Sequence, residues 1–97
     1  MKLRFTPRAV QDLTDLAAYI RERNPQAALR VRAAILETLR HLASFPHVGR
    51  RQRVGNARRL VTRRYRYLVY YTVDDVAQEI VIVTIQHPSR ERMEFEA

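Results

Sequence analysis

The residues best suited to chemistry in this sequence are arginines. Of its 18 basic residues, 17 are arginine and Lys2 is the one lysine. Between Glu37 and Asp74 there is no acidic residue, whereas the same stretch holds nine arginines. A guanidinium stays charged at any working pH and can donate two parallel hydrogen bonds to a phosphate or a carboxylate. The unbalanced charge predicts binding of nucleic acid or an acidic protein, with a solvated face as the simpler alternative.

We predict that the arginines of this block, with two more near the C-terminus, contact a target or its phosphates. If the strands pair as neighbours, the arginines within and after them should meet at one end or one face of the sheet. The candidates are Arg50, Arg51, Arg53, Arg58, Arg59, Arg63, Arg64, Arg66, Arg90 and Arg92.

Cleavage of RNA without a metal is one reaction such a cluster could support. It needs a group that accepts the 2′-OH proton and one that protonates the leaving oxygen, while arginine stabilises the charge on the phosphorane. His87 is the best acid or base candidate, because imidazole ordinarily titrates near neutral pH. A structural role is more common for a single histidine at a strand end. Tyrosines could stack on bases, although in a central strand they more often pack against the sheet; these are Tyr65, Tyr67, Tyr70 and Tyr71.

Other reaction classes lack their residues. The sequence has no cysteine, which excludes nucleophilic-cysteine chemistry and a thiolate metal site. His41, His47 and His87 have no paired spacing and no accompanying carboxylate cluster, so we expect no metal. With two glycines there is no phosphate-binding glycine-rich loop, and no nucleophile-elbow motif occurs. We therefore expect no cofactor.

Length and composition predict one small basic domain spanning residues 1–97. The chain has 97 residues, 46% of them hydrophobic, and a formal net charge of +8. Two domains of ordinary size would not fit. The first residues lack the apolar core of a signal peptide, and no stretch approaches the length of a membrane span. We expect a cytoplasmic protein with no membrane partner.

The hydrophobic pattern predicts an α+β fold in the order β-α-α-β-β-β. Leu3 and Phe5 alternate with basic residues, which is typical of a short strand. A helix-capping residue followed by proline occurs twice, at Thr6-Pro7 and at Asn24-Pro25. We therefore expect one helix over about 7–23 and a second from 25 to near Phe45-Pro46. An arginine-rich loop should cover 46–56. Strands are expected over 60–62, 65–73 and 79–86, forming an antiparallel meander packed under the helical hairpin.

Several segments, taken in order, resemble the RelE/ParE superfamily of toxins from bacterial type II toxin–antitoxin systems, and the similarity covers nearly the whole chain. The segments are Tyr19-Ile20 with Asn24-Pro25-Gln26-Ala27-Ala28, Leu42 to Arg50, Ala57-Arg58-Arg59-Leu60-Val61, Tyr67-Leu68-Val69-Tyr70-Tyr71, and His87-Pro88-Ser89-Arg90. The resemblance implies the fold described above and an acidic antitoxin that wraps and neutralises the toxin.

The resemblance also implies two possible activities. The RelE-like branch cuts mRNA on the ribosome, with a basic residue before the Leu-Val-Tyr of its central strand, an arginine after the last strand and a C-terminal proton-transfer residue. Here Tyr67 takes the first position and Arg90 or Arg92 can take the second, whereas the C-terminal position has no obvious equivalent. The helix-junction and His87-Pro88 segments look more like the ParE branch, which poisons DNA gyrase by protein–protein contact without catalysis. We favour that branch; the alternatives are an mRNA endonuclease, or an inactive relative that binds only nucleic acid or antitoxin.

Overall fold

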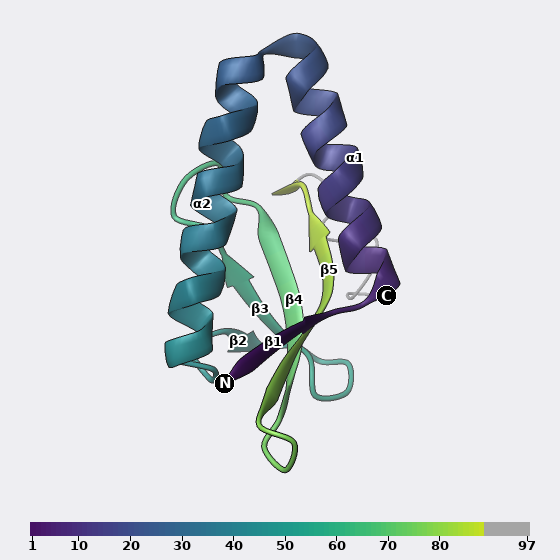
Figure 1. The fold of residues 1–97 in the computed structure, drawn as a ribbon. Coiled ribbons are helices and arrows are strands. Elements are labelled where there is room, and N and C mark those ends of the chain that lie inside the picture. The colour runs from purple at the N-terminus through teal and green to yellow at the C-terminus, as the bar shows by residue number, and fades with distance from the viewer. Residues whose placement is uncertain (89–97) are drawn as a thin grey trace.

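The computed structural model describes residues 1–88 and consists of a helical hairpin packed on one face of a five-stranded sheet (Figure 1). The strands lie in the spatial order β1-β5-β4-β3-β2, so the last two long strands occupy the centre. The α+β fold expected from the sequence is confirmed. In chain order the elements are β1 (Lys2–Phe5), α1 (Pro7–Arg23), α2 (Pro25–Ser44), β2 (Arg50–Arg51), β3 (Arg58–Val61), β4 (Leu68–Asp74) and β5 (Glu79–Gln86).

Both helices begin where the cap-then-proline pattern predicts. The Thr6 hydroxyl accepts a hydrogen bond from the Ala9 amide at 3.0 Å, and the Asn24 side chain accepts one from the Ala27 amide at 3.1 Å. Asn24 also ends α1, since its amide donates to the Ile20 carbonyl at 2.7 Å. One residue therefore closes the first helix and starts the second, and the chain must reverse direction there.

The sheet differs from the predicted meander in three respects. First, β1 pairs with β5 in parallel, which makes the sheet mixed. Second, the predicted loop over 46–56 contains β2, a two-residue strand antiparallel to β3. Third, the strand predicted from residue 65 begins at Leu68, because Tyr65 and Arg66 have φ of 66° and 55° and lie in a turn. β-branched and aromatic composition indicated a strand there, but a left-handed backbone cannot continue a ladder.

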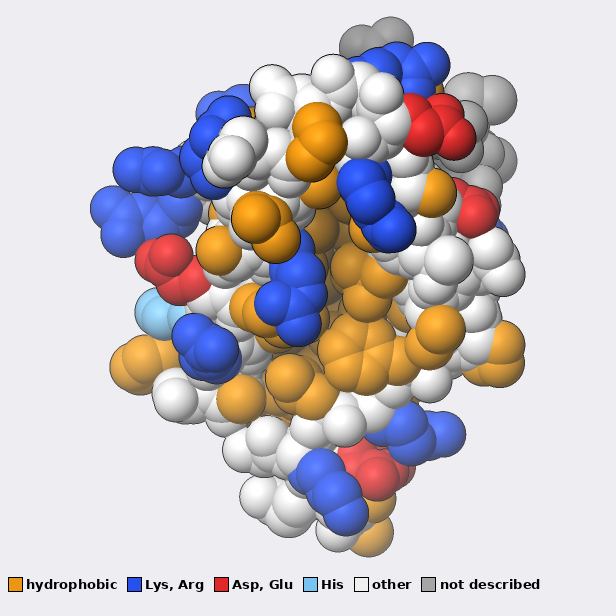
Figure 2. All heavy atoms as spheres, turned by 45° about the horizontal axis from the view of Figure 1, so that its top comes forward, with side chains coloured by type: hydrophobic (Ala, Val, Ile, Leu, Met, Phe, Trp, Pro, Cys, Tyr) orange, Lys and Arg blue, Asp and Glu red, His pale blue; other side chains and the backbone are white. Residues whose placement is uncertain are grey.

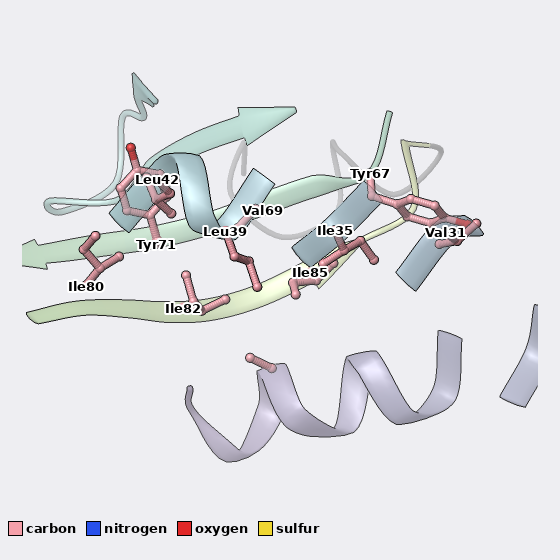
Figure 3. Packing of buried hydrophobic residues seen from close by; sticks show 11 residues of the cluster. Val31, Ile35, Leu39, Leu42, Tyr67, Val69, Tyr71, Ile80, Ile82 and Ile85 are labelled. Carbon is pink, nitrogen blue, oxygen red and sulfur yellow. The ribbon is translucent and has the colours of Figure 1, made fainter. Parts of the chain in front are cut away.

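The hydrophobic core lies between α2 and the two central strands. From α2 it takes Val31, Ile35, Leu39 and Leu42, which follow one another at the helical spacing of three and four residues (Figure 3). Facing them from the sheet side are Tyr67 just before β4, Val69 and Tyr71 of β4, and Ile80, Ile82 and Ile85 of β5. Successive strand residues point to opposite faces, so core residues alternate along β4 and the first half of β5. At the register shift opposite Tyr70 and Tyr71, the spacing of core residues on β5 becomes three, from Ile82 to Ile85.

α1 closes the edge of β5 where β1 ends. The last β1 pair is Phe5 with Ile82, and beyond it the Thr6 amide donates to the Ile82 carbonyl at 3.1 Å. The Thr6 hydroxyl donates to the Val83 carbonyl at 2.7 Å. Nearly two turns further along α1, the Asp12 carboxylate accepts hydrogen bonds from the Ile85 amide, at 3.1 Å, and from the Thr84 hydroxyl. Side chains of α1 thus supply the partners that a longer β1 would have supplied.

Asp12→Ala should destabilise the fold by about 1–3 kcal/mol, because it leaves the buried Ile85 amide and Thr84 hydroxyl without their acceptor. Urea unfolding followed by circular dichroism measures the change. Asp15→Ala is the matched control, since Asp15 lies on the same helix and accepts only an exposed hydrogen bond from Gln11. Equal stability of the two variants would show that Asp12 does not hold the edge of β5.

Candidate functional site

The arginines of β2 and β3 are divided between the two faces of the sheet. Arg50 lies opposite Arg59, and Arg51 lies opposite Arg58. Residues directly opposite one another in an antiparallel pair share a face, and their sequence neighbours share the other. One pair of arginines therefore lies on each face of the sheet. The four arginines do not form a single patch.

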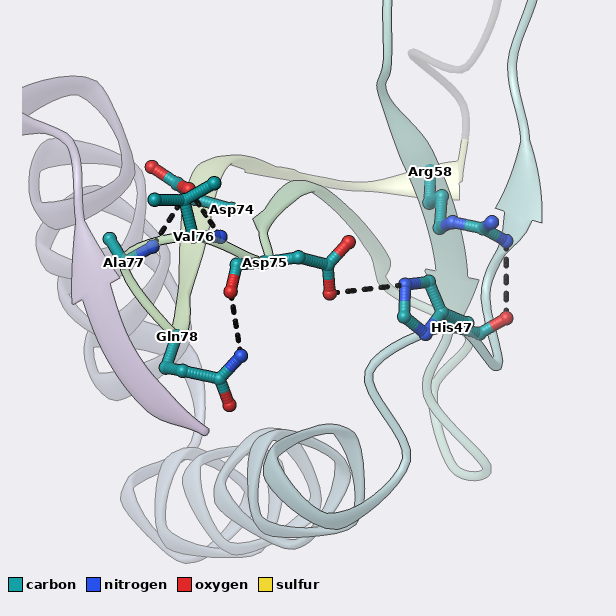
Figure 4. A network of polar contacts seen from close by, with 7 residues as sticks. All are labelled: His47, Arg58, Asp74, Asp75, Val76, Ala77 and Gln78. Carbon is teal, nitrogen blue, oxygen red and sulfur yellow. Dashed lines mark hydrogen bonds and ion pairs between the residues drawn. The ribbon is translucent and has the colours of Figure 1, made fainter.

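Arg58 is used inside the structure. Its guanidinium donates to the His47 carbonyl at 3.1 Å (Figure 4). It also donates to the Gly49 carbonyl at 2.9 Å. The His47 imidazole in turn lies 3.8 Å from the Asp75 carboxylate in the β4–β5 turn, with both side chains largely exposed. These contacts attach the segment after α2 to the sheet, so at least one of the predicted target-binding arginines has a structural role.

Arg63, Arg64 and Arg66 lie in the turn that follows β3, beyond the end of the strand opposite to Arg58 and Arg59. With a rise of about 3.3 Å per residue, the length of β3 separates this group from the β2–β3 arginines. The expectation that these arginines meet at one end or one face is therefore wrong: strand direction separates them into two groups. Arg53 lies in the β2–β3 loop, and Arg90 and Arg92 lie outside the described residues.

His87 lies at the same end of the sheet as this turn. Its ring meets the Tyr67 ring edge-on, with centroids 5.8 Å apart. Tyr67 is 7% exposed and belongs to the core, and burial raises the pKa of its phenol above the ordinary value. Tyr70 and Tyr71 are fully buried, so among the four tyrosines considered for base stacking, Tyr65 is the one that reaches the surface.

Tyr71 of β4 contacts the segment after α2 at Gly49. Its hydroxyl accepts a hydrogen bond from the Gly49 amide at 2.8 Å, and burial is the main cause that raises its pKa. Gly49 packs directly on the phenol ring: a Cβ at this position would lie 2.7 Å from ring atom Cε1 and 2.9 Å from Cζ. A glycine is required here because any side chain would overlap a fully buried ring.

Gly49→Ala should destabilise the chain by about 1–3 kcal/mol, because the new methyl group must displace the Tyr71 ring. Gly55→Ala is a control for glycine replacement in open space, since no atom lies within 4 Å of a Cβ there, although its φ of +55° adds its own backbone strain. Thermal unfolding and a near-ultraviolet tyrosine spectrum measure the effects. Loss of the native tyrosine signal is expected for Gly49→Ala alone; an unchanged spectrum would contradict the packing described.

An apolar groove between the two helices was not anticipated from the sequence. The helices project beyond the sheet, so their outer halves face each other without a strand beneath them (Figure 1). Figure 2 shows the result as a hollow floored by hydrophobic side chains. We call this the hairpin groove; its volume is about 480 Å³, and it is lined by Phe5, Leu13, Leu16, Ala17, Ile20, Arg21, Ala28, Leu29, Val31, Arg32, Ile35, Leu36 and Leu39.

The hairpin groove combines apolar walls with cationic margins. Leu29 is 67% exposed, whereas Leu13, Leu16 and Ile20 are half-buried. Arg21 and Arg32 are the charged residues of the lining, and both are exposed. The sequence signal was the length of the two apolar stripes, which continue along the helices past the end of the sheet. Exposed apolar surface of this kind, with polar residues at its margin, is typical of a protein interaction site.

Comparison with known proteins identifies the family. The family model of the ParE toxin of the type II toxin–antitoxin system parDE matches residues 3–92. The chain belongs to the ParE toxin family. A curated relative from Sinorhizobium fredii (strain NBRC 101917 / NGR234), named "Putative toxin Y4kP", is 34% identical over 86 residues, which are 89% of this chain and 86% of that protein.

Solved toxin structures share the fold of this ParE-family chain. The chromosomal ParDE system from P. aeruginosa matches with a TM-score of 0.76 and 26% identity, over 90% of this chain and 95% of that one. The RelBE2 toxin–antitoxin complex from Mycobacterium tuberculosis matches with a TM-score of 0.63 and 28% identity, over 89% of this chain and 95% of that one. The intact RelBE complex from E. coli, at 16% identity and a TM-score of 0.64 over 89% and 94%, is similar in fold.

Within residues 1–88, no helix is both long enough and apolar enough to cross a bilayer. Over the same residues, no three His, Cys, Asp or Glu side chains are grouped as a metal site would require. The geometry in this range offers guanidiniums, an apolar groove and the exposed imidazoles of His41, His47 and His87.

Proposed function

We propose that this ParE-family toxin inhibits DNA gyrase by protein–protein contact, and that an acidic antitoxin neutralises it by occupying the hairpin groove. The observation that carries the proposal is the groove itself, an apolar surface on a chain of net charge +8 with arginines at its margin. Both activities would place the protein in the cytoplasm, where its target and its antitoxin are made.

The chemistry of the hairpin groove favours an amphipathic helix with acidic flanks. Its apolar residues come from two antiparallel helices, and a third helix laid between them would bury its own apolar stripe. Arg21 and Arg32 would then meet carboxylates on the flanks of that helix. The partner in the similar ParDE and RelBE systems is an antitoxin, which supports the same kind of partner here.

Leu29→Asp should weaken antitoxin binding by about tenfold or more, because it places a carboxylate in the apolar part of the interface. Leu29 is 67% exposed in the free chain, so the fold should tolerate the change. The antitoxin to test is the acidic product of the adjacent reading frame, titrated by calorimetry. Val76→Asp is the matched control, since Val76 is 97% exposed in the β4–β5 turn, far from the groove lining. Equal affinities of the two variants would remove the groove from the interface.

The position of Tyr67 supports a non-catalytic target contact. The RelE-like nucleases that the sequence resembles carry a basic residue at this point before the central strand. Here the position holds a phenol that is 7% exposed, packed in the core and kept protonated by burial. A buried neutral phenol contributes no cation for a phosphate and no exposed group for proton transfer.

One observation favours the second candidate, a ribosome-dependent mRNA endonuclease. His87 and the arginines Arg63, Arg64 and Arg66 lie at one end of the sheet, where a phosphodiester could meet both an imidazole and guanidiniums. The likeness to the RelBE2 complex, at 28% identity, adds to it. The nuclease is our second candidate because Tyr67 stands where RelE-like nucleases carry a basic residue before the central strand.

Gyrase inhibition and mRNA cleavage can be separated in one paired experiment. The purified toxin is added to a gyrase supercoiling assay and, in parallel, to translating ribosomes carrying a reporter mRNA. We expect loss of supercoiling with accumulation of cleaved DNA complexes, and intact mRNA. His87→Gln should retain this activity, because a contact toxin needs no proton transfer at this residue. Codon-phased mRNA cuts that disappear in His87→Gln would overturn the proposal in favour of the nuclease.

A further inference from the structure

A second cavity lies beside the core-facing stripe of α2, against the turn between β3 and β4. Its volume is about 510 Å³, and we call it the α2–turn pocket. The helix contributes residues at spacings of three and four, and the turn contributes two arginines. The lining consists of Arg30, Ala33, Ala34, Glu37, Thr38, Arg63 and Arg64.

The lining brings three guanidiniums to one cavity with one carboxylate. Arg30 comes from the first half of α2, while Arg63 and Arg64 come from a segment more than thirty residues later in the chain. None of the ion pairs formed within residues 1–88 involves these three arginines or Glu37. The side chains of Ala33 and Ala34 are small and leave space in the cavity. The Thr38 hydroxyl donates a hydrogen bond to the Ala34 carbonyl at 3.1 Å. The charged groups therefore face an open volume.

The turn that carries Arg63 and Arg64 is held rigidly. Thr62, which is 1% exposed, donates from its hydroxyl to the Arg64 carbonyl at 2.5 Å and accepts from the Tyr67 amide at 3.0 Å. The Thr62 amide also donates to the Tyr67 carbonyl at 2.9 Å. Within this closed turn, Tyr65 and Arg66 have φ of 66° and 55°, a conformation that side chains disfavour. Such backbone strain is retained mostly where a site needs a fixed geometry.

We propose that the α2–turn pocket binds a phosphate ester of nucleotide size. Guanidiniums converging from a helix and a rigid turn suit the oxygens of one or two phosphates, since each fork donates paired hydrogen bonds. Glu37 would repel a bare anion, but its carboxylate can accept hydrogen bonds from ribose hydroxyls or a base amino group. The volume lies within the range of about 300–1,000 Å³ typical of small-molecule sites. This inference is independent of the antitoxin site, because the pocket shares no lining residue with the hairpin groove.

The test is a calorimetric titration of the full chain with ADP and with pyrophosphate at about 150 mM salt, which suppresses diffuse attraction to a basic surface. Arg63→Gln with Arg64→Gln should weaken ADP binding by about tenfold or more. Arg51→Gln with Arg53→Gln removes the same charge outside the pocket and should change the affinity less than about threefold. Equal losses in the two double variants, or no binding of ADP to the unchanged chain, would overturn the proposal.

Two further variants test the shape and the carboxylate of the pocket. Ala33→Leu keeps helix propensity and charge but places a larger side chain in the cavity. It should therefore abolish ADP binding with unchanged thermal stability. Retained binding would overturn the pocket assignment. Glu37→Gln should strengthen pyrophosphate binding and reduce the preference for ADP over pyrophosphate. An unchanged preference would contradict the role given to Glu37. A 5′-phosphorylated trinucleotide added in competition with ADP distinguishes a nucleic-acid end from a free nucleotide as the source of the phosphate ester.

Discussion

The fold depends on how the edge of β5 is completed. β1 pairs with this strand only as far as Ile82, and Thr6 and Asp12 supply the partners beyond it. Because the first turns of α1 are attached to the sheet in this way, the helix leaves the sheet at a fixed angle and its second half projects past the strands (Figure 1). α2 must return alongside it. The hairpin groove is a direct consequence, since two apolar stripes continue where no strand remains to cover them.

The arginine block shows how a single charge feature in a sequence becomes several different features in a fold. Alternation along β2 and β3 sends neighbouring arginines to opposite faces, and the direction of β3 separates them from the arginines of the following turn. Arg58 is taken up by the carbonyls of His47 and Gly49. Arg63 and Arg64 instead face α2 across an open cavity. Net charge describes the long-range attraction to anions, whereas the short-range chemistry differs at each arginine.

The two surfaces suit different ligands because their linings differ. The hairpin groove is mostly apolar, so an amphipathic protein segment would gain by burying its hydrophobic stripe there. The α2–turn pocket is lined by charge and small residues, so a compact polar ligand fits it better. They lie on separate faces of α2, and occupation of one leaves the other open. One small ParE-family chain therefore presents two chemically distinct surfaces.

The sequence by itself determined the elements that depend on local chemistry. The two cap-and-proline pairs set the helix starts at Pro7 and Pro25, and the apolar periods identified Leu39 or Ile82 as core. Only the tertiary structure decided the parallel β1–β5 pairing, the left-handed turn at Tyr65 and the two cavities. Each of these depends on which distant segments become neighbours: pairing direction follows from the path of the hairpin, and a cavity exists only where packed elements fail to fill the space between them. Local propensity contains no information about such non-local contacts.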